Sequence, residues 1–203
     1  PSVTASATPV ICTIQFEDVI TGSTFYPYVK CLACLGIING YPFGGPGEPC
    51  NGNNDPYFRP NDSVTRGQLT KIVSESAGFN DAVSGQTFED VQPGSTFYTY
   101  TERLILHSVM SGYPCGGPGE PCGPDSKPYF RPNSGATRGQ LTKIVSNAAG
   151  YSDPPQGQTF EDVQPGSSFY TYTQRLTSRG VMNGYPCGGI GEPCVPPNSR
   201  PYF

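Results

Sequence analysis

The sequence contains no tryptophan, a single histidine and only 14% charged residues. Because His107 is the only imidazole, no multi-histidine zinc site and no convincing serine–histidine–aspartate set can be assembled. Lysine and arginine number 12 against 16 acidic residues, which leaves a net charge of −4 and no basic stripe for nucleic acid. No run of about 18 apolar residues occurs, so we expect no membrane-spanning helix.

Glycine and proline are abundant instead, with 26 and 23 residues, and there are 13 tyrosines and 11 phenylalanines. So much glycine and proline predicts many turns and long loops. Disordered chains are poor in aromatic residues, so we expect these loops to be ordered. The polar start at Pro1 fits an exported chain whose signal has been removed, and it also fits a fragment.

Eight cysteines at recurring spacings indicate a disulfide framework formed outside the cytoplasm, so we expect an extracellular or cell-surface location. We predict two local bridges, each closing a loop rich in glycine and proline: Cys115–Cys122 and Cys187–Cys194. The gap of six residues within each pair differs from zinc-ligand spacing, and we expect no metal centre.

The equivalent loop of the first repeat has Phe43 where the others have their first cysteine, so Cys50 lacks a local mate. Together with Cys12, Cys31 and Cys34 it allows three pairings. Because Cys34 lies nearer the loop, we predict Cys34–Cys50 and Cys12–Cys31.

Three repeats with a period of 72 residues organise the chain, as the starts of the Phe-Glu-Asp-Val motif at Phe16, Phe88 and Phe160 show. Gly-Tyr-Pro recurs with them, and the decapeptide TRGQLTKIVS occurs at 65–74 and 137–146. We divide the chain into an extended segment 1–15, repeats 16–80 and 81–151, and an incomplete repeat 152–203. Residues 81–86 and 152–157 read as linkers.

Each repeat is predicted to hold a first helix, a long loop and a second helix. In the second repeat the first helix spans about 96–107, with Ser95 or Thr96 as its cap. Phe97, Tyr100, Thr101 and Leu104 form its apolar stripe. Gly36 and Gly180 are placed to end the same helix in the other two repeats.

The second helix carries stronger signals. Thr65 and Thr137 are followed three residues later by Gln68 and Gln140, which predicts a capping box. Gly78 and Gly150, each followed by an aromatic residue, predict Schellman endings. Separately, apolar residues alternate over 9–16, which predicts a short N-terminal strand.

This order of motifs, from Phe-x-Asp-Val through Gly-Tyr and Phe-Arg-Pro-Asn to Thr-Arg-x-Gln, resembles the S-layer homology domain from Phe16 to Phe203. The resemblance implies a mainly α fold with long ordered loops, built of helix-loop-helix repeats arranged as a pseudo-threefold helical prism. It also implies a bacterial cell-surface location. Members of the family bind pyruvylated cell-wall polysaccharide or form the surface lattice. The cysteine-bearing loops are not part of the family's general pattern.

The family's glycan-contacting Thr-Arg-Ala-Glu segment corresponds to Thr-Arg-Gly-Gln here, and its usual tryptophan corresponds to Phe25, Phe97 and Phe169. An arginine at a helix N-terminus suits a carboxylate ligand, which the free amides there also favour. The alternative is that these arginines only bridge repeats by bonding carbonyls or Asp18, Asp90 and Asp162. The resemblance thus implies these candidate glycan-binding residues: Thr65, Arg66, Gln68, Thr137, Arg138 and Gln140.

The repeated Glu-Asp pairs are adjacent in sequence, and we expect their aspartates to bond nearby loop or helix-end amides rather than to catalyse a reaction. We therefore expect no enzyme and no cofactor. The alternative is a structural calcium ion near Asp55 or Asp125, although neither loop has the ligand spacing of a strong calcium site. Asn61 begins a glycosylation sequon.

We predict a non-enzymatic protein whose copies assemble head to tail into a surface layer, sheath, tube or filament. The alternative is an anchor module that binds acidic cell-wall polysaccharide. The third repeat stops before its second helix, so we expect its first helix to be exposed and the N-terminal segment of another copy to dock. The candidate assembly contacts are Val10, Cys12, Ile14, Phe169, Tyr172 and Leu176.

Overall fold

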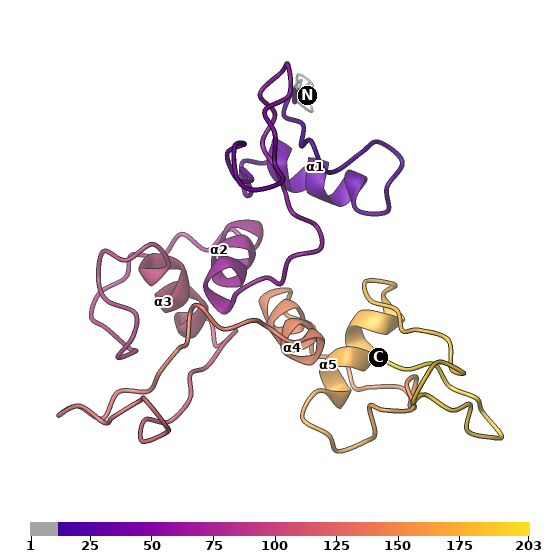
Figure 1. Ribbon diagram of the computed structural model, residues 1–203. Helices are drawn as coiled ribbons and strands as arrows, with labels where there is room; N and C mark the ends of the chain where they lie inside the picture. The colour runs from indigo at the N-terminus through magenta and orange to yellow at the C-terminus, as the bar shows by residue number, and fades with distance from the viewer. Residues whose placement is uncertain (1–11) are drawn as a thin grey trace, which may run out of the picture. The chain divides into compact units, whose positions relative to one another are not determined.

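The computed structural model of the protein describes residues 12–203, where five α-helices are joined by long loops (Figure 1). The described residues form no sheet, and their β-structure is limited to isolated bridges such as Tyr113 with Tyr129. The expected class, mainly α with long ordered loops, is therefore confirmed, while the threefold prism stays a prediction. The helices are α1 (Tyr26–Cys34), α2 (Arg66–Ser76), α3 (Tyr98–Leu106), α4 (Arg138–Ala148) and α5 (Tyr170–Ser178).

The chain divides into two compact bodies, an N-terminal body that ends at Asp62 and a C-terminal body that begins at Ser63. In the C-terminal body α2 packs against α3, α4 packs against α5, and α2 also contacts α4 (Figure 1). Each closely packed pair joins the second helix of one repeat to the first helix of the next. The packing module is thus offset from the sequence repeat.

Both second helices begin and end as the sequence predicts. Thr65 and Thr137 cap α2 and α4 with complete capping boxes. At the end of α2, Gly78 has a φ of 70°. Its amide donates to Glu75 O and the amide of Phe79 donates to Ser74 O, which is the Schellman pattern. The end of α4 repeats this geometry.

The first helices form with different caps from those expected. The N-cap of α3 is Phe97, with no side-chain hydrogen bond, so capping by Ser95 or Thr96 is wrong. A turn takes its place, in which the Tyr98 amide donates to Ser95 O over 3.1 Å. Gly36 and Gly180 have the left-handed conformation expected after α1 and α5, and Ser108 adopts the same conformation after α3, at a φ of 55°.

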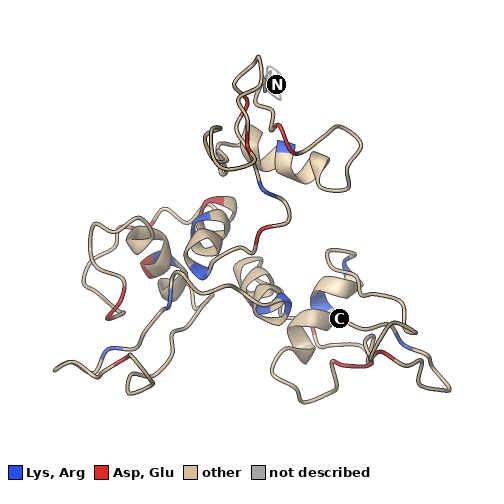
Figure 2. Ribbon diagram, viewed as in Figure 1, with Lys and Arg blue, Asp and Glu red and all other residues tan. Residues whose placement is uncertain are grey.

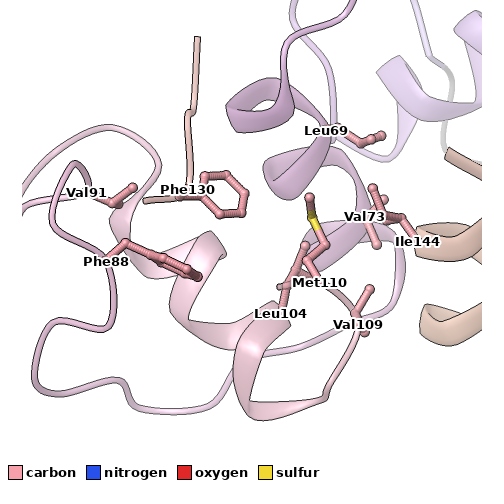
Figure 3. Packing of buried hydrophobic residues seen from close by; sticks show 9 residues of the cluster. All are labelled: Leu69, Val73, Phe88, Val91, Leu104, Val109, Met110, Phe130 and Ile144. Atoms are coloured by element: carbon pink, nitrogen blue, oxygen red, sulfur yellow. The ribbon is translucent and has the colours of Figure 1, made fainter. Parts of the chain in front are cut away.

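One apolar core lies in the C-terminal body and contains residues of α2, α3 and α4 (Figure 3). Leu104 of α3 is fully buried and packs with Leu69 and Val73 of α2. Phe88 and Phe130, from the loops of the second repeat, stack at a tilt with ring centroids 5.1 Å apart. The Phe-Glu-Asp-Val motif therefore repeats because its phenylalanine is a core residue.

Two of the predicted disulfides are confirmed and two are wrong. Cys115–Cys122 and Cys187–Cys194 close their loops as expected. Cys12 bonds Cys34 instead of Cys31, and Cys31 and Cys50 are free and exposed. Cys34 is the last residue of α1, and the segment that contains Cys12 passes beside it. The pairing therefore follows the distance between the cysteines in the fold and not their distance from the loop along the chain.

The predicted N-terminal strand is not formed in its described part, residues 12–16. The alternation behind the prediction is nevertheless visible in burial, because Cys12 and Ile14 are half-buried, Phe16 is buried and the residues between them are exposed. An extended segment without a pairing partner makes no sheet hydrogen bonds. Residues 9–11, including Val10, lie outside the described residues.

Candidate functional site

Arg66, the first residue of α2, is a buried cation held by backbone carbonyls of the next repeat. Its side chain is only 5% exposed. Nε donates to Phe130 O over 2.8 Å and Nη2 donates to Ser111 O over 3.0 Å. The interpretation that this arginine bridges repeats through carbonyls is therefore confirmed. Burial lowers the pKa of the guanidinium, although arginine stays charged in proteins.

The backbone amides at the start of α2 are already occupied. Arg66 N donates to Ser134 O and Gly67 N donates to Pro132 O, each over 2.8 Å. The segment before α4 also forms a bridge, Thr65 with Gly135. The expectation that free amides at this helix end attract an anion is wrong for α2, because a neighbouring segment of the chain satisfies them.

Tyr113 of the Gly-Tyr-Pro motif lies between two arginines. The guanidinium of Arg131 is 4.0 Å from its ring centroid and that of Arg66 is 5.0 Å away. Arg131 is fixed by two hydrogen bonds to the carboxylate of Glu120, at 2.7 and 2.8 Å. That contact lowers the pKa of Glu120. The charge of Arg131 is therefore paired with a carboxylate, whereas Arg66 forms no ion pair with any described residue.

A pocket of about 160 Å³ opens beside Arg66. It lies between residues 109–113, which follow α3, the helix α4 and the start of α5. Lys143 lines it as a second cation without an ionic partner among the described residues. Phe169 and Tyr113 line it as aromatic rings, and Gln140 donates from Nε2 to the Tyr113 hydroxyl over 3.0 Å. The pocket thus combines positive charge, ring faces and an amide, while most acidic residues lie in loops elsewhere (Figure 2).

The candidate residues taken from the two Thr-Arg-Gly-Gln segments have different roles. Arg66 and Gln140 come together in this pocket from different repeats. Thr65, Gln68 and Thr137 serve the capping boxes and do not line it.

Arg138 makes the same bonds as Arg66, to Phe203 O and Asn183 O at 2.9 Å each, but it is exposed. Sequence reasoning missed Tyr113 and Lys143 as pocket residues, although both belong to motifs that recur.

The aspartates of the repeated Glu-Asp pairs bond loop amides, as expected. Asp90 accepts from Phe130 N at 2.7 Å and from Arg131 N at 2.6 Å. Arg131 has a φ of 60°, a conformation that non-glycine residues rarely adopt. Asp18 holds the corresponding amides of the first repeat and Asp162 accepts from Phe203 N. Asp90 therefore shapes the loop whose Phe130 carbonyl holds Arg66.

The remaining candidates have local structural contacts. Asp55 accepts from Asn51 Nδ2, Asp125 pairs with Lys127, and Asn61 is exposed. His107 bonds Asp81 at 2.7 Å. Within residues 12–203 no group of three or more acidic, histidine or cysteine side chains is placed to hold a metal ion. No helix in that range is long and apolar enough to cross a membrane.

Comparison with protein families matches residues 15–70 to the S-layer homology domain. No curated protein matches the chain. The matched range covers the first repeat up to the Thr-Arg-Gly-Gln start of α2, and the second repeat carries the same motifs 72 residues later. A domain of this kind indicates cell-surface anchoring or S-layer association. Residues 15–70 therefore match the S-layer homology domain, a structural and anchoring module.

Proposed function

We propose that the protein is a non-enzymatic surface module that binds an acidic polysaccharide of the cell wall in the Arg66 pocket. The observation that supports this is a buried guanidinium with no carboxylate partner among the described residues, beside a pocket lined by a second cation. A buried charge is costly unless it is paired. A carboxylate on a glycan supplies the missing charge.

The other lining groups suit a sugar. The rings of Phe169 and Tyr113 offer apolar faces for a pyranose ring, while Gln140 offers polar atoms for hydroxyl groups. Lys143 stands on α4, whose start is fixed by its capping box, so its position is set by a rigid element. Charge attraction of this kind weakens as salt is added, so we expect binding to fall with ionic strength.

A matched pair of lysines tests the proposal. Lys143 and Lys71 occupy the same position of the repeated decapeptide, but only Lys143 lines the pocket. We expect Lys143→Gln to weaken binding to purified acidic cell-wall polysaccharide by about fivefold in a sedimentation assay. Lys71→Gln makes the same change of charge and should leave binding as it is. Equal effects of the two substitutions, or no binding by the parent protein, contradict the proposal.

A second function, self-assembly of copies into a surface layer or filament, is favoured by apolar side chains on the N-terminal body. Ile20, Tyr28 and Leu35 are 72%, 69% and 68% exposed. Burying exposed apolar side chains against another copy removes them from water, which favours association. We propose that copies associate head to tail through this body, with the segment 1–15 as the docking element.

The contacts expected at the third repeat need correction. Leu176 is fully buried, and Phe169 and Tyr172 are half-buried. The reason is that α4, the second helix of the preceding repeat, already covers α5.

Assembly is tested on the exposed side of the N-terminal body. We expect negative-stain microscopy and sedimentation velocity to show polymers of the parent chain, and Tyr28→Ser combined with Leu35→Ser to abolish them. Leu106→Ser, at a leucine that is 62% exposed in the other body, is the control. A parent protein that stays monomeric at high concentration rules the proposal out.

A further inference from the structure

A second cavity lies away from the Arg66 pocket, between residues 153–156 and one side of α5. Its volume is about 110 Å³. The helix contributes Gln174, Arg175, Thr177 and Ser178 to its lining, and Thr159 completes it. Neither the repeated Thr-Arg-Gly-Gln segments nor the residues proposed for glycan binding take part.

The second repeat shows what this place looks like when its hydrogen bonds are complete. There Glu102 occupies the position of Gln174, and Thr87 occupies that of Thr159. Glu102 accepts from Thr87 N at 2.9 Å and from Thr87 Oγ1 at 2.6 Å. One buried carboxylate therefore satisfies both donors of the threonine.

In the third repeat an amide replaces this carboxylate. Gln174 is only 4% exposed, its Oε1 accepts from Thr159 Oγ1 at 2.6 Å, and its Nε2 has no partner among the described residues. Turning the amide over lets one N–H donate to Thr159 Oγ1, since a hydroxyl oxygen also accepts hydrogen bonds. The second N–H and the hydroxyl hydrogen of the threonine then lack an acceptor within the pair. In either orientation at least two donor hydrogens are left without an acceptor inside the Thr159–Gln174 pair.

Two other residues that line the cavity, Thr177 and Arg175, also bring hydrogen-bond donors or positive charge without a matching acceptor. Thr177 Oγ1 is buried without a partner among the described residues, at a position where the second repeat has Ile105. Arg175 donates from Nε to Asp153 O over 2.8 Å. The carboxylate of Asp153 is itself held by Arg179, at 2.6 and 3.2 Å. The charge of Arg175 is therefore left without a carboxylate of its own among the described residues.

We propose that this cavity binds a small carboxylate, whose oxygens accept the donor hydrogens that Gln174 leaves unpaired where the second repeat has the Glu102 carboxylate. The ligand accepts hydrogen bonds from the Thr159–Gln174 group and from Thr177, and it balances the charge of Arg175. The volume exceeds the share of about 30 Å³ that one water has in the liquid. It is smaller than the cavity of about 150 Å³ that holds benzene. An acetate-sized group fits between these limits.

The test uses acetate as the probe and the whole chain labelled with ¹⁵N. Sodium acetate is titrated against sodium chloride of equal ionic strength, and the Thr159 backbone amide and the Gln174 side-chain amide are followed by NMR. A ligand of four non-hydrogen atoms reaches a dissociation constant of about 40 µM at best, so the titration extends into the millimolar range. We expect saturable shifts with acetate alone. The Thr87 amide, which already has its carboxylate, should not move.

Two substitutions separate a ligand site from a cavity that holds only water. Gln174→Glu restores the carboxylate of the second repeat, and Thr177→Ile fills the cavity with the side chain found there. Each should abolish the acetate response while the spectrum stays dispersed. An equal response to chloride, no saturable response, or a response that survives Gln174→Glu overturns the proposal. Because none of these residues lines the Arg66 pocket, the outcome is independent of glycan binding.

Discussion

The ring of Phe169 lies so close to the backbone of Gly139 that a β-carbon built on this glycine would fall 2.5 Å from its Cδ2 atom. Phe97 and Gly67 have the same relationship in the preceding helix pair, at 2.4 Å. Each glycine is the second residue of a second helix, and each phenylalanine caps the first helix of the next repeat. The contact therefore fixes how consecutive repeats meet, and it places Phe169 in the wall of the Arg66 pocket.

We expect Gly139→Ala to destabilise the protein even though alanine favours helices. The gain in helix propensity is about 1 kcal/mol at most, whereas overpacking a well-filled contact costs about 1–3 kcal/mol. Chemical denaturation should show a net loss of about 1 kcal/mol. Gly52→Ala is the control, because its β-carbon meets no atom within 4 Å. A stabilised Gly139→Ala variant means that the ring moves aside freely.

We expect Phe43→Cys to create a third loop disulfide, with Cys50. The two equivalent bridges span the same sequence separation of 7 and have Cα atoms 5.0 Å apart. The first repeat also keeps the turn of the loop, since Gly44 N donates to Glu48 O at 2.8 Å, as Gly116 N does to Glu120 O at 2.7 Å. Closing such a short loop stabilises by about 2–3 kcal/mol in the chain-entropy model.

Alkylation of the native protein measures this outcome. The parent chain should expose two reactive thiols, Cys31 and Cys50, and the Phe43→Cys variant should expose one. Three reactive thiols in the variant, under conditions that keep Cys115–Cys122 oxidised, show that the loop of the first repeat differs from its counterparts.

We expect two equivalent contacts, between His107 and Asp81 and between Arg179 and Asp153, to weaken in acid. His107 stacks on Phe79 at 3.8 Å and bonds Asp81, while Arg179 lies 4.0 Å from the Tyr151 ring centroid. The side-chain hydrogen bond from His107 lowers the pKa of Asp81, and that from Arg179 lowers the pKa of Asp153. Both contributions are therefore present above about pH 4 and are lost as the pH falls through the lowered pKa values.

Hydrogen-exchange protection of residues 79–87 and of residues 151–159 should therefore decline as the pH falls below about 4. Asp81→Asn and Asp153→Asn remove the ionisable carboxylates, and each should remove the acid-dependent loss of protection from its own linker alone. Protection in the parent protein that does not change between about pH 7 and 3 shows that stacking on the aromatic ring, and not charge, holds the linkers.

Local features could be read from the sequence because their partners lie only a few residues away. The capping boxes of Thr65 and Thr137 and the ending at Gly78 need side chains or carbonyls within about one turn. The Cys115–Cys122 bridge was predictable for the same reason. Cys12–Cys34 was not, because four cysteines without a local mate allow several pairings and only the path of the chain past α1 decides among them.

The repeat, the helix ends and the chemistry of the motifs follow from the sequence alone, since each depends on residue type and short spacing. The packing of the second helix of one repeat on the first helix of the next is visible only in the fold, because similar apolar stripes do not specify a partner. The fold also places Arg66 and Gln140, 74 positions apart, in one pocket. Long-range packing brings them together, and the carbonyls that hold Arg66, from Ser111 and Phe130, are backbone atoms that no residue pattern distinguishes.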